Sequence, residues 1–262
     1  MNALLSLDAV AFAYARTPVL HEVSLDVEAG ARLGILGPNG SGKTTLLRLA
    51  SGALAPTRGR VRLEGADVTT LARSAVARRL AVVPQETELA FDYSVLEIVL
   101  MGRYPHLGAF EVEGPGDLSA ANAALEATGT LALAEREFRT LSGGEKQRVV
   151  IASAIAQLTV EDGDGAGAPA PLLLLDEPTA SLDLRYQLEI AALLRRLHDA
   201  RGITTILSTH DLHFARSVCT EIVLLARGRV LARGPVDAVL TPALVADLYG
   251  IAAADAAPLV AR

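Results

Sequence analysis

The sequence has little cysteine, no tryptophan and no excess of basic charge. Its 262 residues hold a single cysteine, Cys219, which cannot form a disulfide within the chain, and this fits a reducing compartment such as the cytoplasm. The formal net charge is −6, with arginines scattered along the chain. A general nucleic-acid binder usually carries a basic stripe, so this balance argues against such a protein. We therefore expect no nucleic acid among its partners.

Long apolar runs and targeting signals are also missing. No stretch approaches the ~20 apolar residues that span a bilayer. The N-terminal sequence MNALLSLDAV lacks the basic start and the long apolar core of a signal peptide. We therefore expect a chain that does not insert into the membrane by itself. The length of 262 residues is enough for one large α/β domain with a substantial core.

Short apolar segments predict an α/β fold with a mixed sheet. Residues 4–14 and 19–30 alternate in polarity, with a loop expected near Thr17–Pro18, and predict an antiparallel β portion at the N-terminal side. Three apolar runs are typical of buried strands: 32–37, 172–178 and 202–211. The last two are separated by an amphipathic segment of the length that a helical crossover between parallel strands needs.

A helical insert interrupts this pattern. From residue 87 to about 158 strand signals disappear and the apolar residues follow helical spacing. We expect a single domain over residues 1–262, with a core of about 1–86 and 159–250 and a helical subdomain of about 87–158. The Gly/Ala/Pro-rich segment 161–171 predicts a mobile loop.

The stretch GPNGSGKT matches the phosphate-loop pattern G-x-x-x-x-G-K-[ST] in full, between a predicted strand and a predicted helix. Its glycines let backbone N–H groups approach phosphate oxygens, and the helix N-terminus favours negative charge. We expect Lys43 to reach the β- and γ-phosphates of a nucleotide and Thr44 to contact Mg²⁺. The residues expected to hold the nucleotide here are Gly37, Pro38, Asn39, Gly40, Ser41, Gly42, Lys43, Thr44 and Thr45.

Polar residues follow three of the predicted strands. Asp176 and Glu177 end the run LLLLDEP, and ligands of parallel α/β sheets bind at this edge. We expect Asp176 to hold Mg²⁺, directly or through water, and Glu177 to orient or deprotonate the attacking water. His210 in STHD and Gln85 in AVVPQ stand at two further strand ends. Taken alone, His210 is also explained as a structural residue, and Gln85 as a loop glutamine.

A second anion-binding turn is predicted about a hundred residues after the phosphate loop. In LSGGEKQRV, Ser142, Gly143 and Gly144 precede charged, helix-forming residues. A helix N-terminus with exposed backbone donors and a serine hydroxyl is an anion site. By itself the turn is also explained as an ordinary glycine-rich helix start.

Six motifs in a fixed order carry a family resemblance: GPNGSGKTT, the glutamine of VVPQ, LSGGEKQRV, LLLLDEP, SLD at Ser181 to Asp183, and STHD. Over essentially its whole length the chain resembles the nucleotide-binding subunit of ATP-binding cassette transporters. The resemblance implies a P-loop (RecA-like) core and a Mg²⁺-dependent ATPase coupled to transport. It also implies two copies packed head to tail, with ATP sandwiched between the phosphate loop of one copy and the Ser142 turn of the other.

The resemblance implies roles for individual residues. Tyr14 matches the aromatic position that stacks on adenine, with an ordinary strand tyrosine as the alternative. Gln85 would contact Mg²⁺ and the attacking water, and His210 would contact the γ-phosphate. Asp183 would cross the dimer interface toward the partner's phosphate loop. The chain departs from the family pattern at Glu145, where glutamine is commoner, and at Ser153, where arginine is usual; the second departure implies altered helix packing or a changed surface ion pair.

Residues 100–110 (LMGRYPHLGAF) and 181–190 (SLDLRYQLEI) resemble importer subunits for iron-siderophores, haem or cobalamin. This implies integral membrane permease partners, docked near Arg103 to His106, and indirectly a substrate-binding protein. It places the chain on the cytoplasmic face of the inner membrane as a peripheral subunit. An exporter subunit and an importer for another substrate are the alternatives in this family. A small-molecule kinase is disfavoured because it would lack LSGGE, and a pure binding module because Glu177 is present.

Overall fold

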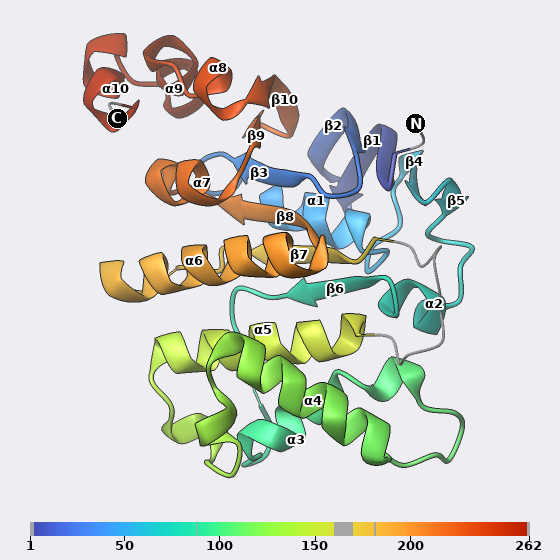
Figure 1. The fold of residues 1–262 in the computed structure, drawn as a ribbon. Coiled ribbons are helices and arrows are strands. Elements are labelled where there is room, and N and C mark those ends of the chain that lie inside the picture. The colour runs from blue at the N-terminus through green and yellow to red at the C-terminus, as the bar shows by residue number, and fades with distance from the viewer. Residues whose placement is uncertain (1–2, 88, 160–169, 181, 261–262) are drawn as a thin grey trace. The chain divides into compact units, whose positions relative to one another are not determined.

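A computed structural model describes residues 3–87, 89–159, 170–180 and 182–260 (Figure 1). The chain groups into two compact units. Unit 1 comprises residues 1–71, 174–177 and 204–262, and unit 2 comprises 72–173 and 178–203. The single domain with a helical subdomain at 87–158 stays a prediction beside this grouping. The loop predicted to be mobile falls mostly on 160–169, outside the described residues.

Unit 1 contains the antiparallel sheet that the alternating segments predict. Its order is β2 (Thr17–Val27), β1 (Leu5–Tyr14), β4 (Arg58–Leu63), β5 (Ala66–Asp67). The loop expected near Thr17–Pro18 is a turn at Ala15 and Arg16, two residues earlier, because Thr17 pairs with Tyr14 and Pro18 with Ala13 inside the sheet. Proline is tolerated there because β2 is an edge strand, where a missing N–H leaves no neighbour unsatisfied.

The second sheet of unit 1 is mixed and carries the buried apolar runs. Its order is β10 (Arg229–Pro235), β9 (Glu221–Ala226), β3 (Arg32–Leu36), β8 (Thr204–Thr209), followed by the end of β7 (Leu172–Asp176). β3 runs parallel to both β8 and β9, and β10 is antiparallel to β9. Every residue of β8 is buried, as expected for a strand covered on both faces. The carboxyl ends of β3 and β8 therefore meet at one edge.

The helices of unit 1 are α1 (Lys43–Ala50), α7 (Leu212–Val218), α8 (Val236–Val239), α9 (Pro242–Tyr249) and α10 (Ala253–Val260). In the described part of the chain no single helix has the length and apolarity to cross a membrane. The α9–α10 pair meets those two criteria only when taken together, and it is bent by 115°.

Unit 2 is mainly helical, as predicted for the insert. Its helices are α2 (Arg73–Ala77), α3 (Val95–Met101), α4 (Pro115–Thr128), α5 (Gly143–Leu158) and α6 (Leu184–Arg201), with short 3₁₀ turns η1 (Tyr104–His106), η2 (Leu131–Leu133) and η3 (Phe138–Thr140). Among the described residues of unit 2, the one strand that lies wholly in the unit is β6 (Leu80–Val83). α5 packs against α3 and α4 (Figure 1). The Ser153 hydroxyl, on α5, donates to the Ile98 carbonyl of α3 at 3.0 Å, so this departure from the family pattern joins two helices.

A buried arginine ties the ends of three unit 2 elements together. Arg103, just before η1, is 1% exposed, and its Nε donates to Asp117 Oδ1 at 2.9 Å. Its Nη1 donates to the carbonyls of Ala156 and Thr159 at 2.7 and 2.5 Å. The neighbouring Tyr104 side chain is 56% exposed. Within the segment predicted to dock a membrane partner, Arg103 is thus an internal group and Tyr104 a surface group.

Candidate functional site

The phosphate loop connects β3 to α1 and depends on glycine at defined places. The backbone is left-handed at Gly40 (φ 78°) and Gly42 (φ 105°), where side chains are disfavoured. A Cβ on Gly37 would overlap the Leu225 carbonyl and the Ser41 hydroxyl. These three glycines therefore permit the tight turn that the motif predicts. Asn39 and Gly40 are exposed at its tip, and Pro38, Gly42 and Thr44 are half-buried.

Lys43 bridges the loop to the acidic strand end. Its Nζ donates to the carbonyls of Gly37 at 2.9 Å and Pro38 at 3.3 Å. The same ammonium forms an ion pair with Glu177 Oε1 at 3.2 Å, and Lys43 is 5% exposed. A cation so placed, between a turn of backbone dipoles and one carboxylate, is ready to receive an anion in the loop.

Ser41 has a hydroxyl that no group in the described part of the chain satisfies. Its Oγ is buried and without a hydrogen-bond partner. Leaving such a group unpaired costs about 1–3 kcal/mol. An oxyanion in the loop would accept this hydrogen bond, so the loop fits a phosphate group. Thr45, also in the loop region, is buried at the start of α1.

A divalent cation fits the carboxyl-end edge of the mixed sheet only if phosphate oxygens supply further ligands. Over residues 3–87, 89–159, 170–180 and 182–260, no cluster of three or more His, Cys, Asp or Glu side chains is arranged to hold a metal. The predicted ligands Thr44 and Asp176 offer a hydroxyl and a carboxylate, which are oxygen donors that Mg²⁺ prefers. Mg²⁺ is commonly bound by one or two such groups together with substrate phosphates. The donor set therefore fits a nucleotide-bound Mg²⁺.

The two acidic residues at the end of β7 share one partner on β8. Asp176 is 7% exposed, and its Oδ1 accepts a hydrogen bond from Ser208 Oγ at 2.5 Å. The Glu177 N–H donates to both the carbonyl and the hydroxyl of Ser208 at 3.1 Å. Glu177 has a left-handed backbone, with φ 45°. A non-glycine residue in this region is held at a cost of about 1–3 kcal/mol, and such strain clusters at functional sites.

Glu177 also reaches His210. Its Oε2 lies 2.8 Å from His210 Nδ1, while its Oε1 pairs with Lys43. The His210 side chain is 56% exposed, so its other face is open to a ligand. Tyr249 of α9 donates its hydroxyl to the His210 carbonyl at 3.1 Å. Burial, followed by the charges of Asp211 and Glu177, raises the pKa of Tyr249, so the phenol stays a donor.

The predicted adenine platform, Tyr14, lies at the end of β1. Its ring is 44% exposed and packs edge-on against Phe12, with centroids 4.9 Å apart. The ring therefore has a face available for stacking. Its role with adenine stays a prediction.

Five predicted site residues lie in unit 2. Gln85 is exposed just after β6. Ser142 is the N-cap of α5, and Gly143 and Gly144 form its first turn. Asp183 is the N-cap of α6, where its Oδ1 accepts from the Tyr186 N–H at 3.0 Å. Ser181, in the same motif as Asp183, lies outside the described residues. The roles of these residues toward a nucleotide stay predictions.

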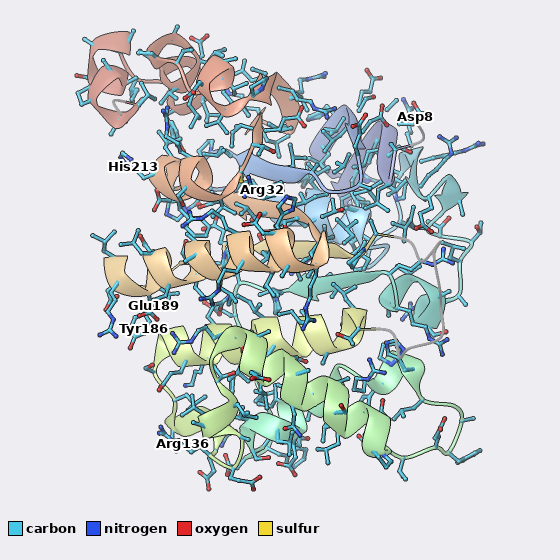
Figure 2. All side chains as sticks on the ribbon, viewed as in Figure 1. Asp8, Arg32, Arg136, Tyr186, Glu189 and His213 are labelled. Carbon is cyan, nitrogen blue, oxygen red and sulfur yellow. The ribbon has the colours of Figure 1, made fainter. Side chains whose placement is uncertain are left out.

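The serine turn is closed by its own glutamate. Ser142 donates both its N–H and its hydroxyl to Glu145 Oε2 at 2.8 Å, and the Glu145 N–H donates to Ser142 Oγ at 3.4 Å. These hydrogen bonds from Ser142, backbone first, lower the pKa of Glu145. The glycines of the turn also make room for neighbours. A Cβ on Gly144 would overlap the ring of Tyr186, which lies on α6 (Figure 2).

Comparison with known proteins decides the family. The sequence model of the ABC transporter family matches residues 20–180, more than half of the chain. The chain belongs to the ABC transporter family. It is 42% identical over 236 residues to the hemin import ATP-binding protein HmuV of Bordetella pertussis, covering 90% of this chain and 88% of that protein.

A second relative is the cobalamin import ATP-binding protein BtuD of Halobacterium salinarum. The identity is 40% over 228 residues, which cover 87% of this chain and 54% of that protein. The chain thus spans about half the length of this ABC relative.

Solved ABC structures have the same fold. An inward-facing metal-chelate type ABC transporter matches with a TM-score of 0.81 and 32% identity, covering 95% of this chain and 90% of that one. The cbiO1 protein of Clostridium perfringens, part of the ABC transporter complex cbiONQ, matches with a TM-score of 0.78 and 27% identity, covering 94% of each chain. The P-loop core with a mixed sheet, expected from the sequence, is therefore the fold of this ABC protein.

Two groups at the site are not indicated by any sequence pattern. Ser208 is the first residue of STHD, and the functional role predicted for this motif belongs to its histidine. Tyr249 is about 40 residues further along, in a helix with no motif of its own. Their contacts with the acidic pair and His210 arise from strand and helix packing, which spacing along the chain does not reveal.

Proposed function

We propose that this chain is the ATP-hydrolysing subunit of an importer for an iron chelate (siderophore or haem) or cobalamin. The observation that carries the proposal is that Glu177 contacts both Lys43 and His210. The phosphate loop that holds Lys43 also contains the unpaired hydroxyl of Ser41. It joins a cation, a base and an open histidine at the mouth of a phosphate loop. The names of the hemin, cobalamin and metal-chelate relatives support the import function.

In this proposal the Lys43 ammonium exchanges Glu177 for the β- and γ-phosphates of ATP. The exchange frees Glu177 Oε1 to accept the proton of the attacking water, while His210 holds Oε2 and faces the γ-phosphate. Mg²⁺, when bound, would offset the negative charge that develops on the phosphates. Thr44, Asp176 and Gln85 would hold it.

The proposal extends to assembly. Two copies of the chain would sandwich ATP, with Ser142, Gly143 and Gly144 of one copy facing the γ-phosphate held by the other. Tyr14 would stack on adenine, and Asp183 would cross the interface. Residues 1–262 would act as one nucleotide-binding domain with a helical subdomain at about 87–158. Loss of the γ-phosphate would loosen the sandwich.

A permease partner would place the chain on the cytoplasmic face of the inner membrane, and a substrate-binding protein would supply the cargo. A pull-down from native membranes with this chain as bait, read by mass spectrometry, tests this part. Recovery of a polytopic permease together with a binding protein supports import. Recovery of a permease without any binding protein would favour the exporter alternative.

The catalytic part is tested with Glu177→Gln, which removes the base and keeps the shape. We expect ATP hydrolysis to fall by about 10²-fold or more, the lower range for a general base, while ATP still binds and the dimer accumulates. The measurements are phosphate release and size-exclusion chromatography with ATP. The matched control is Glu221→Gln, which removes a carboxylate paired with Arg233 at 2.8 Å elsewhere in unit 1. Wild-type turnover in Glu177→Gln would rule out the assignment of Glu177.

Lys43→Ala tests the phosphate loop itself. The variant lacks the cation that the bound phosphates would meet, so we expect nucleotide affinity to drop at least tenfold, the effect of about 1.4 kcal/mol. Titration with a fluorescent ATP analogue measures it. Unchanged affinity would contradict the loop's proposed role.

A further inference from the structure

Ser208 connects the two carboxylates of the proposed site. It is the next-to-last residue of β8 and is fully buried, with 0% exposure. Its hydroxyl donates to Asp176 Oδ1 at 2.5 Å and accepts from the Glu177 N–H at 3.1 Å. The Ser208 carbonyl accepts from the same N–H at 3.1 Å. One short side chain therefore contacts both acidic residues, on a neighbouring strand.

The chemistry of a hydroxyl suits this place. A serine offers one donor and two acceptor lone pairs on a stem of one carbon. The donor directed at Asp176 fixes which carboxylate oxygen remains available to a ligand. The acceptor helps to hold the Glu177 backbone in its left-handed conformation, from which the side chain reaches Lys43 and His210. The side chain of an alanine or valine could do neither, and only the backbone carbonyl at this position would still accept from the Glu177 N–H.

We infer that Ser208 is a positioning residue for ATP hydrolysis, acting through Asp176 on the divalent cation and through Glu177 on the attacking water. The inference rests on the proposed function and deepens it. Groups that hydrogen-bond to a metal-binding carboxylate orient it and tune its affinity. Ser208 itself touches neither nucleotide nor water in this assignment.

A second buried hydroxyl on the same strand provides a matched control. Thr204, at the other end of β8, is 0% exposed, and its Oγ1 accepts from the Gly30 N–H at 2.8 Å. Removing either hydroxyl deletes a hydrogen bond made by a fully buried residue of β8. Only the loss of the Ser208 hydroxyl removes a contact with Asp176 and Glu177.

The experiment compares Ser208→Ala, Thr204→Val and the wild type in the full-length chain. Mn²⁺ binding in the presence of ADP, followed by electron paramagnetic resonance, gives the affinity for the cation. We expect Ser208→Ala to weaken Mn²⁺ affinity and kcat by about 10–100-fold, the usual loss when such a supporting group is removed. ADP affinity in EDTA should stay at the wild-type value, and Thr204→Val should leave Mn²⁺ affinity unchanged.

Two further variants keep the inference falsifiable. Ser208→Cys retains the approximate size with a weak donor, and serves if the alanine variant does not fold. In an Asp176→Asn background, Ser208→Ala should cause no additional loss of Mn²⁺ affinity, because its target carboxylate is already gone. A folded Ser208→Ala or Ser208→Cys variant with wild-type Mn²⁺ affinity and kcat would overturn the inference while leaving the proposed function intact. A wild-type chain that binds no nucleotide would overturn both.

Discussion

Gly144 shows how one residue answers two demands. The sequence indicates a glycine here because a bare backbone exposes its N–H groups to an anion. The structure adds a packing reason, since the Tyr186 ring occupies the space of a Cβ. The ring belongs to another helix of unit 2, so its presence could not be read from the motif.

Gly144→Ala should therefore destabilise the protein by about 1–3 kcal/mol, the usual cost of forcing atoms into a packed contact. Urea unfolding measures it. Gly143→Ala is the control, because its Cβ would meet only the flexible end of Leu182, at 3.3 Å. The Tyr186→Ala background should recover part of the loss. Equal destabilisation by both alanine variants would contradict the packing explanation.

At the proposed catalytic edge, the sequence indicated side chains that gather in the structure, but not the contacts between them. Lys43, Glu177 and His210 were assigned from motif order, and the structure brings the three side chains together. Their mutual distances, and the left-handed backbone of Glu177, depend on how β7 and β8 lie side by side. No pattern along the chain indicates that Ser208 contacts Asp176 and Glu177.

At the scale of elements, helix α5 begins with a capping box that involves the proposed anion turn. Glu145→Ala should lower the free energy of unfolding at neutral pH. Because the folded pKa of Glu145 lies below its ordinary 4.5, this stabilisation is complete above about pH 4.5 and is lost as the pH falls through the folded value. Unfolding curves at pH 7 and at pH 3–4 should therefore show a shrinking difference between wild type and variant.

The matched control for that variant is Glu97→Ala in α3. Glu97 forms the same capping box with Ser94, and hydrogen bonds from Ser94 likewise lower its pKa. We expect the same direction of pH dependence. Only Glu145→Ala should change ATP turnover, so an equal change in both would indicate a general effect of helix fraying.

Arg103 anchors the end of α5 to the start of α4. Arg103→Met should destabilise the protein by about 3–5 kcal/mol, because it leaves the buried Asp117 carboxylate without its ion-pair partner. Thermal unfolding measures the loss. Arg139→Met is the control, since the Arg139–Asp92 pair is more than half exposed and such pairs contribute about 0–1 kcal/mol. Similar losses in both variants would argue against the importance of burial.

Element types were readable from the sequence where periodicity was clear. The helical insert and the antiparallel N-terminal sheet were both predicted. The turn between these strands lies two residues before Thr17–Pro18, since proline signals a turn along the chain but is tolerated on an edge strand. The internal role of Arg103 was also hidden, because an arginine in a short loop is normally a surface residue.

At the scale of the whole molecule, the lone cysteine is a reporter of unfolding. Cys219 is 7% exposed, and burial raises the pKa of its thiol to about 12. Iodoacetamide should therefore label it at pH 8 only through opening of unit 1, and far more slowly than in urea. If ATP binds the folded chain, ATP at 100 times its Kd should slow labelling by about 100-fold, equivalent to 2.7 kcal/mol. Labelling as fast in buffer as in urea would contradict this.

The family could be predicted from the sequence because six motifs occur in order, and the match over residues 20–180 confirms it. The transported molecule could not be predicted from the sequence, since no residue of the chain is expected to contact it. Selectivity of a transporter resides in the subunits that contact the transported molecule.

The left-handed backbone of Glu177 has an evolutionary consequence. Glycine and asparagine adopt this conformation more readily than glutamate does. A library of variants selected for heat survival alone should therefore accumulate Glu177→Gly or Glu177→Asn, and the proposed role of Glu177 predicts that those survivors no longer hydrolyse ATP. Foldability and fitness favour different residues at this position, so selection schemes need a transport readout to retain the glutamate.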